Sequence, residues 1–433
     1  MDFLTIALIS ISVTIVLIIV GVPIAYSIGV GTVGAILFGL GVAPLTRVGL
    51  IPFSVFHSQN WVPLPLFMLM ACIIGETKIG ENVFNAANKW LSRVPGGLLV
   101  SSVVGQGMMA ATMGNSGTTI LTVGTIVAPE VKRLRYNTEF SMSALLTGGV
   151  LGPLIPPSVN MIVYAVIAQA SVSKLFLAGI VPGILLIVMM AAFIIIVCKR
   201  YPDIAPTPIN VTWKERLSSL KSIWPVLLLM TGIIGGIYSG AVTATEAGAV
   251  GVVITLIIAV TSFQFRIANL KRAMTQAATL TAMLSMMIIA VNCFTYIIAV
   301  SGMSNALSSF VSNLEISPLM IIIVINVILL LLGFVMDGLA IMMVTLPLFI
   351  PIVVDLGFNP IWFGVLVCVN IEIALITPPV GLNLYMVSGA FGIPAAKLMR
   401  STVPFIVLLI IFLGLLIAFP GLSTWLPNLS VSS

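Results

Sequence analysis

Four short segments rich in glycine, proline and small polar residues interrupt apolar stretches of this chain. They are residues 114–119, 152–158, 336–338 and 377–383. Proline lacks a backbone N–H and glycine lets the backbone approach a ligand, so carbonyl groups near these residues lose their helical partners. Carbonyl, hydroxyl, amide and carboxylate oxygens are the ligands that a small, hard cation prefers. The four segments therefore predict cation binding.

The predicted sites form two pairs, and each pair joins a hairpin tip to a broken helix. Residues 114–119 pair with 152–158, and residues 336–338 pair with 377–383. The predicted Na⁺ ligands are Asn115, Ser116, Gly152, Pro156, Ser158, Asp337, Gly338, Thr377, Pro378 and Gly381. We expect the substrate between the two tips, where N-termini of half-helices favour an anionic group. The predicted substrate contacts are Gly117, Thr118, Thr119, Asn160 and Asn383.

Other interpretations of these segments stay open. A double proline also fits a simple kink, and Asn115 with Ser116 also fits hydrogen bonding between helices. Asp337 fits a helix N-cap as well as a functional carboxylate, and the two roles are compatible. Glu372 serves either the structure or gating, and Glu246 fits a capping role near a helix start.

The composition is that of a protein inside a lipid bilayer. Of 433 residues, 60% are hydrophobic and only 7% are charged, with a mean hydropathy of +1.25. A soluble domain is about 45–50% apolar and about 25% charged. This excludes a soluble enzyme, a disordered chain and a nucleic-acid binder. Four cysteines without CxxC spacing and a single histidine predict neither a zinc site nor a catalytic histidine cluster.

Apolar stretches of 17 or more residues predict an all-α, multi-pass membrane protein with about ten crossings. The predicted spans are 3–20, 22–42, 61–77, 139–168, 173–198, 223–242, 244–263, 278–300, 361–390 and 402–420. Two more stretches, 97–130 and 319–353, are interrupted near their middle and predict re-entrant helical hairpins. The first stretch lacks the basic region of a signal peptide, so we expect a span. Residues 44–57 and 264–276 fit either interfacial arms or ordinary loops.

The positive charges predict an orientation. With the N-terminus outside and both hairpins re-entrant, 16 of the 18 Lys and Arg residues fall inside, and only Arg47 and Lys174 fall outside. This is the bias of the positive-inside rule, and a single crossing in place of either hairpin would scatter the charges. Both termini are therefore predicted outside.

The two halves of the chain repeat weakly but in constant register. The step in residue number from Asn115 to Asp337 is the same as the step from Pro156-Pro157 to Pro378-Pro379. Each half has five predicted crossings and one hairpin, so the second half runs in the opposite sense. Inverted repeats with broken helices are the architecture of secondary transporters. The predicted domains are scaffold helices 1–57 and 222–276, transport-domain halves 58–198 and 277–420, a cytoplasmic linker 199–221 and an external tail 421–433.

Several motifs resemble those of a known family over nearly the whole chain. They are GVPIA at 21–25, LPLF at 64–67, PGGL at 95–98, GPLIPPS at 152–158, TATEA at 243–247 and TPPVGLN at 377–383. Together they resemble the large membrane subunit, DctM type, of tripartite ATP-independent periplasmic (TRAP) transporters. The first hairpin tip departs from the family, in which the sequence SGS is usually followed by a polar or acidic residue, because residues 114–120 lack a carboxylate.

The resemblance implies an inverted-repeat elevator-type transporter in a bacterial inner membrane, with periplasmic termini. It implies uptake of a small organic acid or related solute, driven by a Na⁺ gradient. A periplasmic substrate-binding protein would deliver the solute, and a small four-helix membrane subunit, expected as a separate chain, would complete the scaffold.

Two alternatives stay open at this point: a stand-alone sodium–dicarboxylate or citrate-type symporter, and a passive channel. No P-loop motif supports ATP-driven transport, and no cluster of intramembrane His, Cys or carboxylate residues supports an enzyme.

Overall fold

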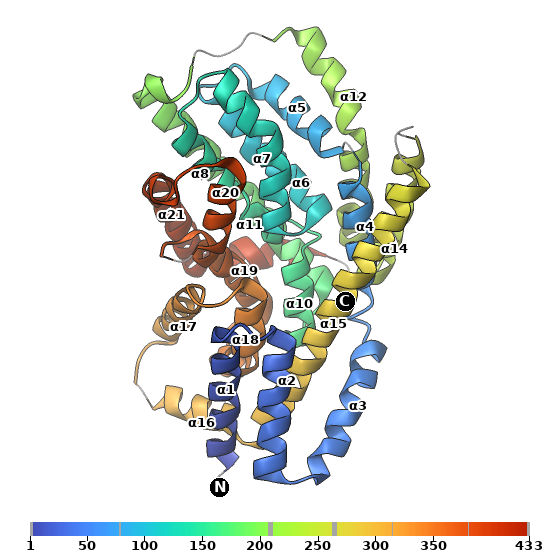
Figure 1. The fold of residues 1–433 in the computed structure, drawn as a ribbon, viewed down its shortest axis with the longest axis vertical. Helices are drawn as coiled ribbons and strands as arrows, with labels where there is room; N and C mark the ends of the chain where they lie inside the picture. The colour runs from blue at the N-terminus through green and yellow to red at the C-terminus, as the bar shows by residue number, and fades with distance from the viewer. Residues whose placement is uncertain are drawn as a thin grey trace.

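Glycines, prolines and capping residues divide the chain into helices, and every regular element that the computed structural model describes is a helix (Figure 1). The described residues are 3–77, 79–206, 211–261, 266–313, 315–379 and 381–430. The predicted all-α class is confirmed for these residues.

The described part of the first half holds eleven α-helices and a short 3-10 turn at Pro202–Ile204. The helices are α1 (Phe3–Ile19), α2 (Ile24–Ala35), α3 (Ala43–His57), α4 (Pro63–Gly75), α5 (Ile79–Leu91), α6 (Gly97–Met113), α7 (Ser116–Arg133), α8 (Thr138–Gly148), α9 (Leu151–Leu154), α10 (Val159–Ala168) and α11 (Val172–Arg200). A π-helical turn at Ile36–Leu40 extends α2.

The second half follows the same plan. Its helices are α12 (Trp213–Met230), α13 (Gly236–Tyr238), α14 (Ala244–Thr261), α15 (Ile267–Val300), α16 (Met303–Ser312), α17 (Pro318–Leu332), α18 (Gly338–Asp355), α19 (Pro360–Ile376), α20 (Leu382–Phe391), α21 (Ala395–Ala418) and α22 (Gly421–Leu429). A second π-helical turn, Thr231–Gly235, joins α12 to α13.

One constant step relates the two halves in structure as well as in sequence. The step in residue number that takes Asn115 to Asp337 takes both bounds of α7 onto those of α18. The same step takes α2 to residues 246–257, inside α14. The peptide bonds Pro156-Pro157 and Pro378-Pro379 are both cis. The predicted internal repeat is confirmed.

Each half contains the predicted helical hairpin. In the first, Gly114 ends α6 with a φ of 60°, a conformation that glycine adopts without steric cost, and Asn115 caps α7. In the second, α17 ends at Leu332 and Asp337 caps α18. The first hairpin lies in the upper half of Figure 1 and the second in the lower half.

Two predicted spans are broken in the middle, as their prolines require. The helix pair Thr138–Leu154 and Val159–Ala168 is bent by 43° across the GPLIPPS motif. In the second half, α19 ends at Ile376 and α20 begins at Leu382, on the two sides of the double proline. Proline removes a helical hydrogen bond and clashes with the preceding turn.

The two halves differ where the sequence lacks helix breakers. In the first half α3 and α4 are separate helices, with Pro63 at the start of α4. In the second half α15 runs unbroken for 34 residues, because residues 267–300 contain neither proline nor glycine. The loop interpretation of residues 44–57 and 264–276 is therefore wrong for their described part. The predicted domain boundary at residue 276 falls inside α15.

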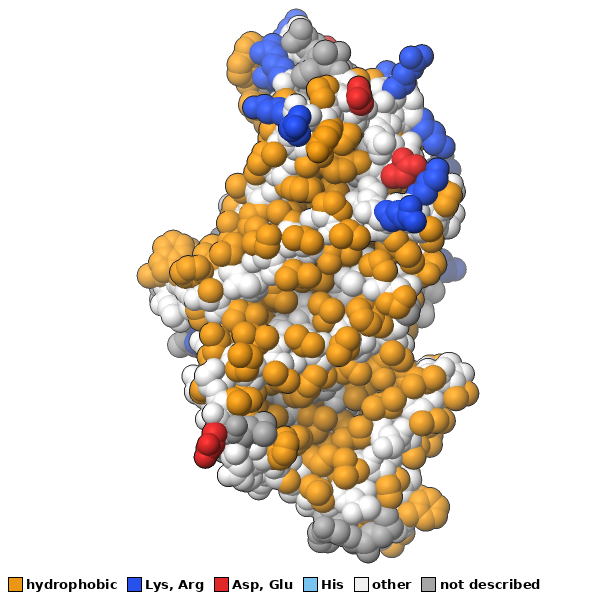
Figure 2. Space-filling model, turned by 90° about the vertical axis from the view of Figure 1, so that its left-hand side faces the viewer, with side chains coloured by type: hydrophobic (Ala, Val, Ile, Leu, Met, Phe, Trp, Pro, Cys, Tyr) orange, Lys and Arg blue, Asp and Glu red, His pale blue; other side chains and the backbone are white. Residues whose placement is uncertain are grey.

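Length and hydropathy support a multi-pass arrangement. Within the described residues, six helices are long and apolar enough to cross a membrane, and the number rises to eight if each of two bent helix pairs is one span. Figure 2 shows hydrophobic side chains over most of the visible face and basic side chains gathered at its upper end. In Figure 1 the same end is formed by α5, α7 and α12, and α1 begins at the opposite end. The positive-inside rule expects such a one-sided distribution.

Candidate functional site

The tip of the first hairpin lies directly against the first helix break. A Cβ atom added at Gly152 would lie 3.0 Å from the carbonyl carbon of Asn115 and 3.1 Å from the amide nitrogen of Ser116. The amide of Val159 donates a hydrogen bond to the carbonyl of Gly114 at 3.3 Å. The structure thus brings together the two segments that the sequence paired, and glycine allows the backbones to touch.

Side chains at this tip are held by local caps. Asn115 Oδ1 accepts a hydrogen bond from the amide of Thr118 at 3.2 Å, and Thr119 Oγ1 donates to the carbonyl of Asn115 at 2.7 Å. In the facing break, Ser158 Oγ accepts from the amide of Met161 at 3.3 Å. These caps hold both half-helix N-termini beside the contact.

Ser116 connects the first hairpin to the second half of the chain. Asn383 Nδ2, from α20, donates a hydrogen bond to Ser116 Oγ at 3.2 Å. The carboxylate of Glu372 in α19 lies within hydrogen-bonding reach of the Ser116 hydroxyl. All three side chains are buried. Ser116 and Asn383, two predicted site residues from opposite halves, therefore meet. Glu372, for which the sequence allowed either a structural role or a role in gating, lies beside them.

The tip of the second hairpin lies against α19. A Cβ at Gly338 would lie 2.5 Å from Cγ2 of Ile371, and one at Gly333 would lie 2.1 Å from Cβ of Ala374. Asp337 is exposed, and its Oδ1 accepts hydrogen bonds from two amides of α18. Among the described residues, no hydrogen bond joins Asp337 to the predicted ligands at residues 377–381.

A cavity of about 350 Å³ lies between the tips and helices α4 and α15. Asn115, Thr118 and Thr122 line it from the first hairpin, and Leu339 lines it from the second. Helix α15 contributes Gln276 and three apolar residues, and α4 with its C-cap contributes five lining residues. This is the place between the tips where the sequence predicts the substrate.

The predicted residues are divided between this cavity and the buried contacts. Two of the predicted residues line the cavity: Thr118, a predicted substrate contact, and Asn115, a predicted cation ligand. The other four predicted substrate contacts do not line it: Gly117, Thr119, Asn160 and Asn383.

The sequence prediction missed Glu76 and Gln276 on the opposite wall of the cavity. Glu76 is the only charged side chain among the described lining residues. It forms an ion pair with Arg272 of α15, with 3.3 Å between Oε2 and Nη1. The Glu76 side chain is 17% exposed and that of Arg272 is 67% exposed, so α4 and α15 are linked at the edge of the cavity. An isolated carboxylate outside any motif gave no sequence signal.

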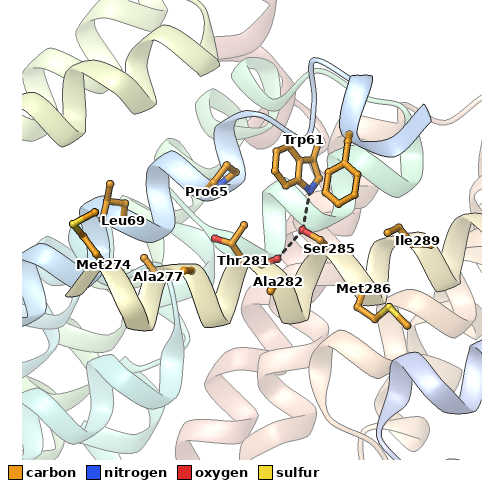
Figure 3. Close-up of a pocket in the computed structure, with 12 residues that line it drawn as sticks. Trp61, Pro65, Leu69, Met274, Ala277, Thr281, Ala282, Ser285, Met286 and Ile289 are labelled. Atoms are coloured by element: carbon orange, nitrogen blue, oxygen red, sulfur yellow. Dashed lines mark hydrogen bonds between the residues drawn. The ribbon is translucent and has the colours of Figure 1, made fainter. Parts of the chain in front are cut away.

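A second, larger cavity of about 610 Å³ is lined by other residues of α4 and α15 (Figure 3). Its lining is apolar apart from Thr281 and Ser285 of α15 and the indole N–H of Trp61, which donates to Ser285 Oγ at 3.1 Å. This hydrogen bond ties the segment between α3 and α4 to α15. Among the described residues, no charged side chain lines this cavity.

The donor atoms at the hairpin tips fit Na⁺. Backbone carbonyls, a serine hydroxyl, amide groups and single carboxylates meet there, which are hard oxygen ligands. Within the part of the chain that the structure describes, the buried Oε2 of Glu372 has no hydrogen-bond partner. Among the described residues, no three or more His, Cys, Asp or Glu side chains group together in a way that would hold a transition metal.

Comparison with known proteins gives consistent results. The sequence matches the family described as "Tripartite ATP-independent periplasmic transporter, DctM component" over residues 11–422. It is 35% identical to the C4-dicarboxylate TRAP transporter large permease protein DctM of Pseudomonas aeruginosa, over 83% of this chain and 84% of that protein. It is 28% identical to the sialic acid TRAP transporter large permease protein SiaM of Vibrio cholerae, over 84% of this chain and 86% of that protein.

A solved structure supports the fold alone. The Alcanivorax borkumensis YdaH transporter, whose structure is described as having an unusual topology, aligns with a TM-score of 0.63 at 14% identity. The alignment covers 89% of this chain and 90% of the YdaH chain.

Proposed function

Because this chain belongs to the DctM component family of tripartite ATP-independent periplasmic transporters, and is a transporter subunit rather than an enzyme, we propose that it moves a small organic acid or related solute inward together with Na⁺ by an elevator movement. One observation carries the proposal. The tips of the two hairpins line one cavity, and each tip packs against the broken helix of its own repeat.

We propose two cation sites. At the first, the backbone around Asn115 and Gly152 and the hydroxyl of Ser116 would hold Na⁺. At the second, the predicted ligands Asp337, Thr377, Pro378 and Gly381 would do so. Na⁺ supplies positive charge at the mouths of the half-helices and couples solute entry to its gradient. The chain's own groups would bind and orient the solute: Thr118 lines the cavity near the N-terminal end of α7, which favours an anionic group.

The proposed elevator movement divides the chain into two parts. The hairpins and broken helices would form the mobile unit, and α1, α2, α12 and α14 would form the static part. Helix α15 contacts both α2 and α4, so it spans the boundary between the two. We place the protein in a bacterial inner membrane with both termini periplasmic.

Partners are part of the proposal. A small four-helix membrane subunit would enlarge the static part, and a periplasmic binding protein would deliver the solute. The relatives are named for C4-dicarboxylates and sialic acid, so these two solute classes are the probes to use first.

The test is uptake into proteoliposomes that contain this chain with its small subunit. We expect accumulation of a labelled C4-dicarboxylate or sialic acid only with the binding protein present and an inward Na⁺ gradient. Uptake without the binding protein would favour the stand-alone symporter. Equilibration without accumulation would favour a channel, and accumulation driven by an inward proton gradient in Na⁺-free medium would reject sodium coupling.

A further inference from the structure

Glu372 is the only buried carboxylate among the described residues. It is 2% exposed, and it lies in α19, where residues 362–376 are all buried. Among the described residues, its Oε2 atom has no hydrogen-bond partner and none of the ion pairs involves Glu372. An uncompensated charge in such a place is strongly destabilising, so intramembrane carboxylates are paired and serve a function.

The Glu372 carboxylate lies within hydrogen-bonding reach of the Ser116 hydroxyl at the first hairpin tip, and Ser116 Oγ accepts from Asn383 Nδ2 at 3.2 Å. Three side chains from α7, α19 and α20 therefore converge on one buried point. The backbone of Ser116 also touches Gly152 in the facing break, so this point adjoins the proposed first cation site.

The internal repeat shows that this cluster is specific to one half. The repeat-equivalent positions of Glu372, Ser116 and Asn383 carry Val150, Gly338 and Met161. None of these offers a side-chain oxygen. A cluster that the fold itself required would occur in both halves. Its presence in one half alone indicates a role specific to the first tip.

The second tip has a carboxylate of its own. Asp337 stands where the first half has the neutral Asn115. Each tip thus has one carboxylate within reach, supplied by the tip itself in the second half and by the opposite half in the first.

We propose that Glu372 is the carboxylate ligand that compensates the charge of Na⁺ at the first hairpin tip, with the Ser116 hydroxyl as its partner ligand. The inference rests on the proposed sodium coupling and deepens it. Bound Na⁺ would join the first hairpin to α19 and α20 of the other half, so that the cation holds together two halves that have no covalent link at this point.

The test is the Na⁺ dependence of thermal unfolding of the purified full chain. NaCl replaces choline chloride at constant ionic strength, and KCl serves as the second reference. A ligand that binds only the folded state raises its stability as its concentration passes the dissociation constant. We expect a saturable rise in the unfolding temperature of the wild type that is specific to Na⁺.

Glu372→Gln should shift the Na⁺ midpoint at least tenfold upward, which corresponds to about 1.4 kcal/mol of binding free energy. In choline the same variant should unfold at the wild-type temperature or above, because an uncompensated buried charge has been removed. Glu372→Asp keeps the charge on a shorter side chain, and we expect a midpoint between those of the wild type and Glu372→Gln.

Asn370→Ala is the matched control, two residues earlier in the same helix. Its side chain donates to the backbone and side chain of Asn326, away from the tip. This variant should unfold earlier in every salt, with the wild-type Na⁺ midpoint.

Two outcomes separate the inference from its premise. If the wild type responds to Na⁺ and Glu372→Gln has the same midpoint, or loses equal stability in Na⁺ and choline, Glu372 is structural and the inference is wrong. If the wild type shows no difference between Na⁺, K⁺ and choline, sodium coupling itself fails.

Discussion

Asn115 and Asp337 occupy equivalent positions in the two repeats, and each caps the second helix of its hairpin. Asn115 Oδ1 accepts from the amide of Thr118 at 3.2 Å, and Asp337 Oδ1 accepts from the amides of Leu339 and Ala340 at 2.9 and 3.0 Å. The two tips share one backbone design and differ in charge. Capping and cation binding can therefore be separated by substitution at Asp337.

Asp337→Ala removes the cap and should lower the free energy of unfolding by about 1 kcal/mol. Asp337→Asn keeps a capping oxygen and removes the charge, so its stability in choline should stay near that of the wild type. Both variants should weaken the response to Na⁺. Thermal unfolding in Na⁺ and in choline measures the two effects separately.

The control for this prediction is Ser317→Ala, which removes the N-cap of α17 at the other end of the same hairpin. It should lose a similar stability in all salts and keep the Na⁺ response. A full Na⁺ response in Asp337→Asn would limit Asp337 to capping.

Gly152→Ala tests the contact between the first tip and its break. The added methyl group would meet the backbone of Asn115 and Ser116 at 3.0–3.1 Å. These are backbone atoms, so the clash cannot be relieved by rotating a flexible side chain. We expect a loss of about 1–3 kcal/mol of stability and a severe loss of transport. Gly389→Ala is the control, because its methyl group meets nothing within 4 Å and replaces a helical glycine of α20. It should be neutral or stabilising by up to about 1 kcal/mol. Wild-type transport by Gly152→Ala would contradict the close contact.

Much of the fold follows from local signals in the sequence. The double prolines mark the two broken helices, and Asn115 and Asp337 mark the two hairpin tips. Each signal occurs in both halves at the same offset in residue number, so the two occurrences support each other. The hydrophobic pattern does not show that residues 267–300 form one continuous helix. Only the absence of glycine and proline from these residues indicates that α15 is unbroken.

The site is less predictable, because its key contacts join opposite halves. Ser116 and Asn383 lie 267 residues apart, and an internal repeat does not specify how the halves interlock. Glu372 is visible as a lone carboxylate in an apolar run, but its burial and its partner emerge only in three dimensions. Glu76 and Gln276 belong to no motif, and they enter the cavity because α4 and α15 pack together.

The ion pair between Glu76 and Arg272 predicts an effect on transport with little effect on stability. An exposed pair contributes less than about 1 kcal/mol, and the Arg272 side chain is 67% exposed. The pair nevertheless links α4 to α15 at the edge of the cavity, and proteoliposome uptake measures its role. Glu76→Arg and Arg272→Glu should each lower the transport rate several-fold by placing like charges together.

The double variant with both charges exchanged should recover much of that rate. The difference from additivity measures the coupling between the two side chains. Losses that simply add in the double variant would mean that the pair does not act as a unit.

The orientation can be tested by labelling with a membrane-impermeant maleimide. The native cysteines are all buried, so their background should be low: Cys72, Cys198, Cys293 and Cys368. Arg47 in α3 and Lys214 in α12 are exposed, and the charge distribution predicts them on opposite sides of the membrane. With the outer membrane permeabilised, Arg47→Cys should react in intact cells. Lys214→Cys should react only after the inner membrane is broken, and the opposite result would invert every loop and place both termini in the cytoplasm.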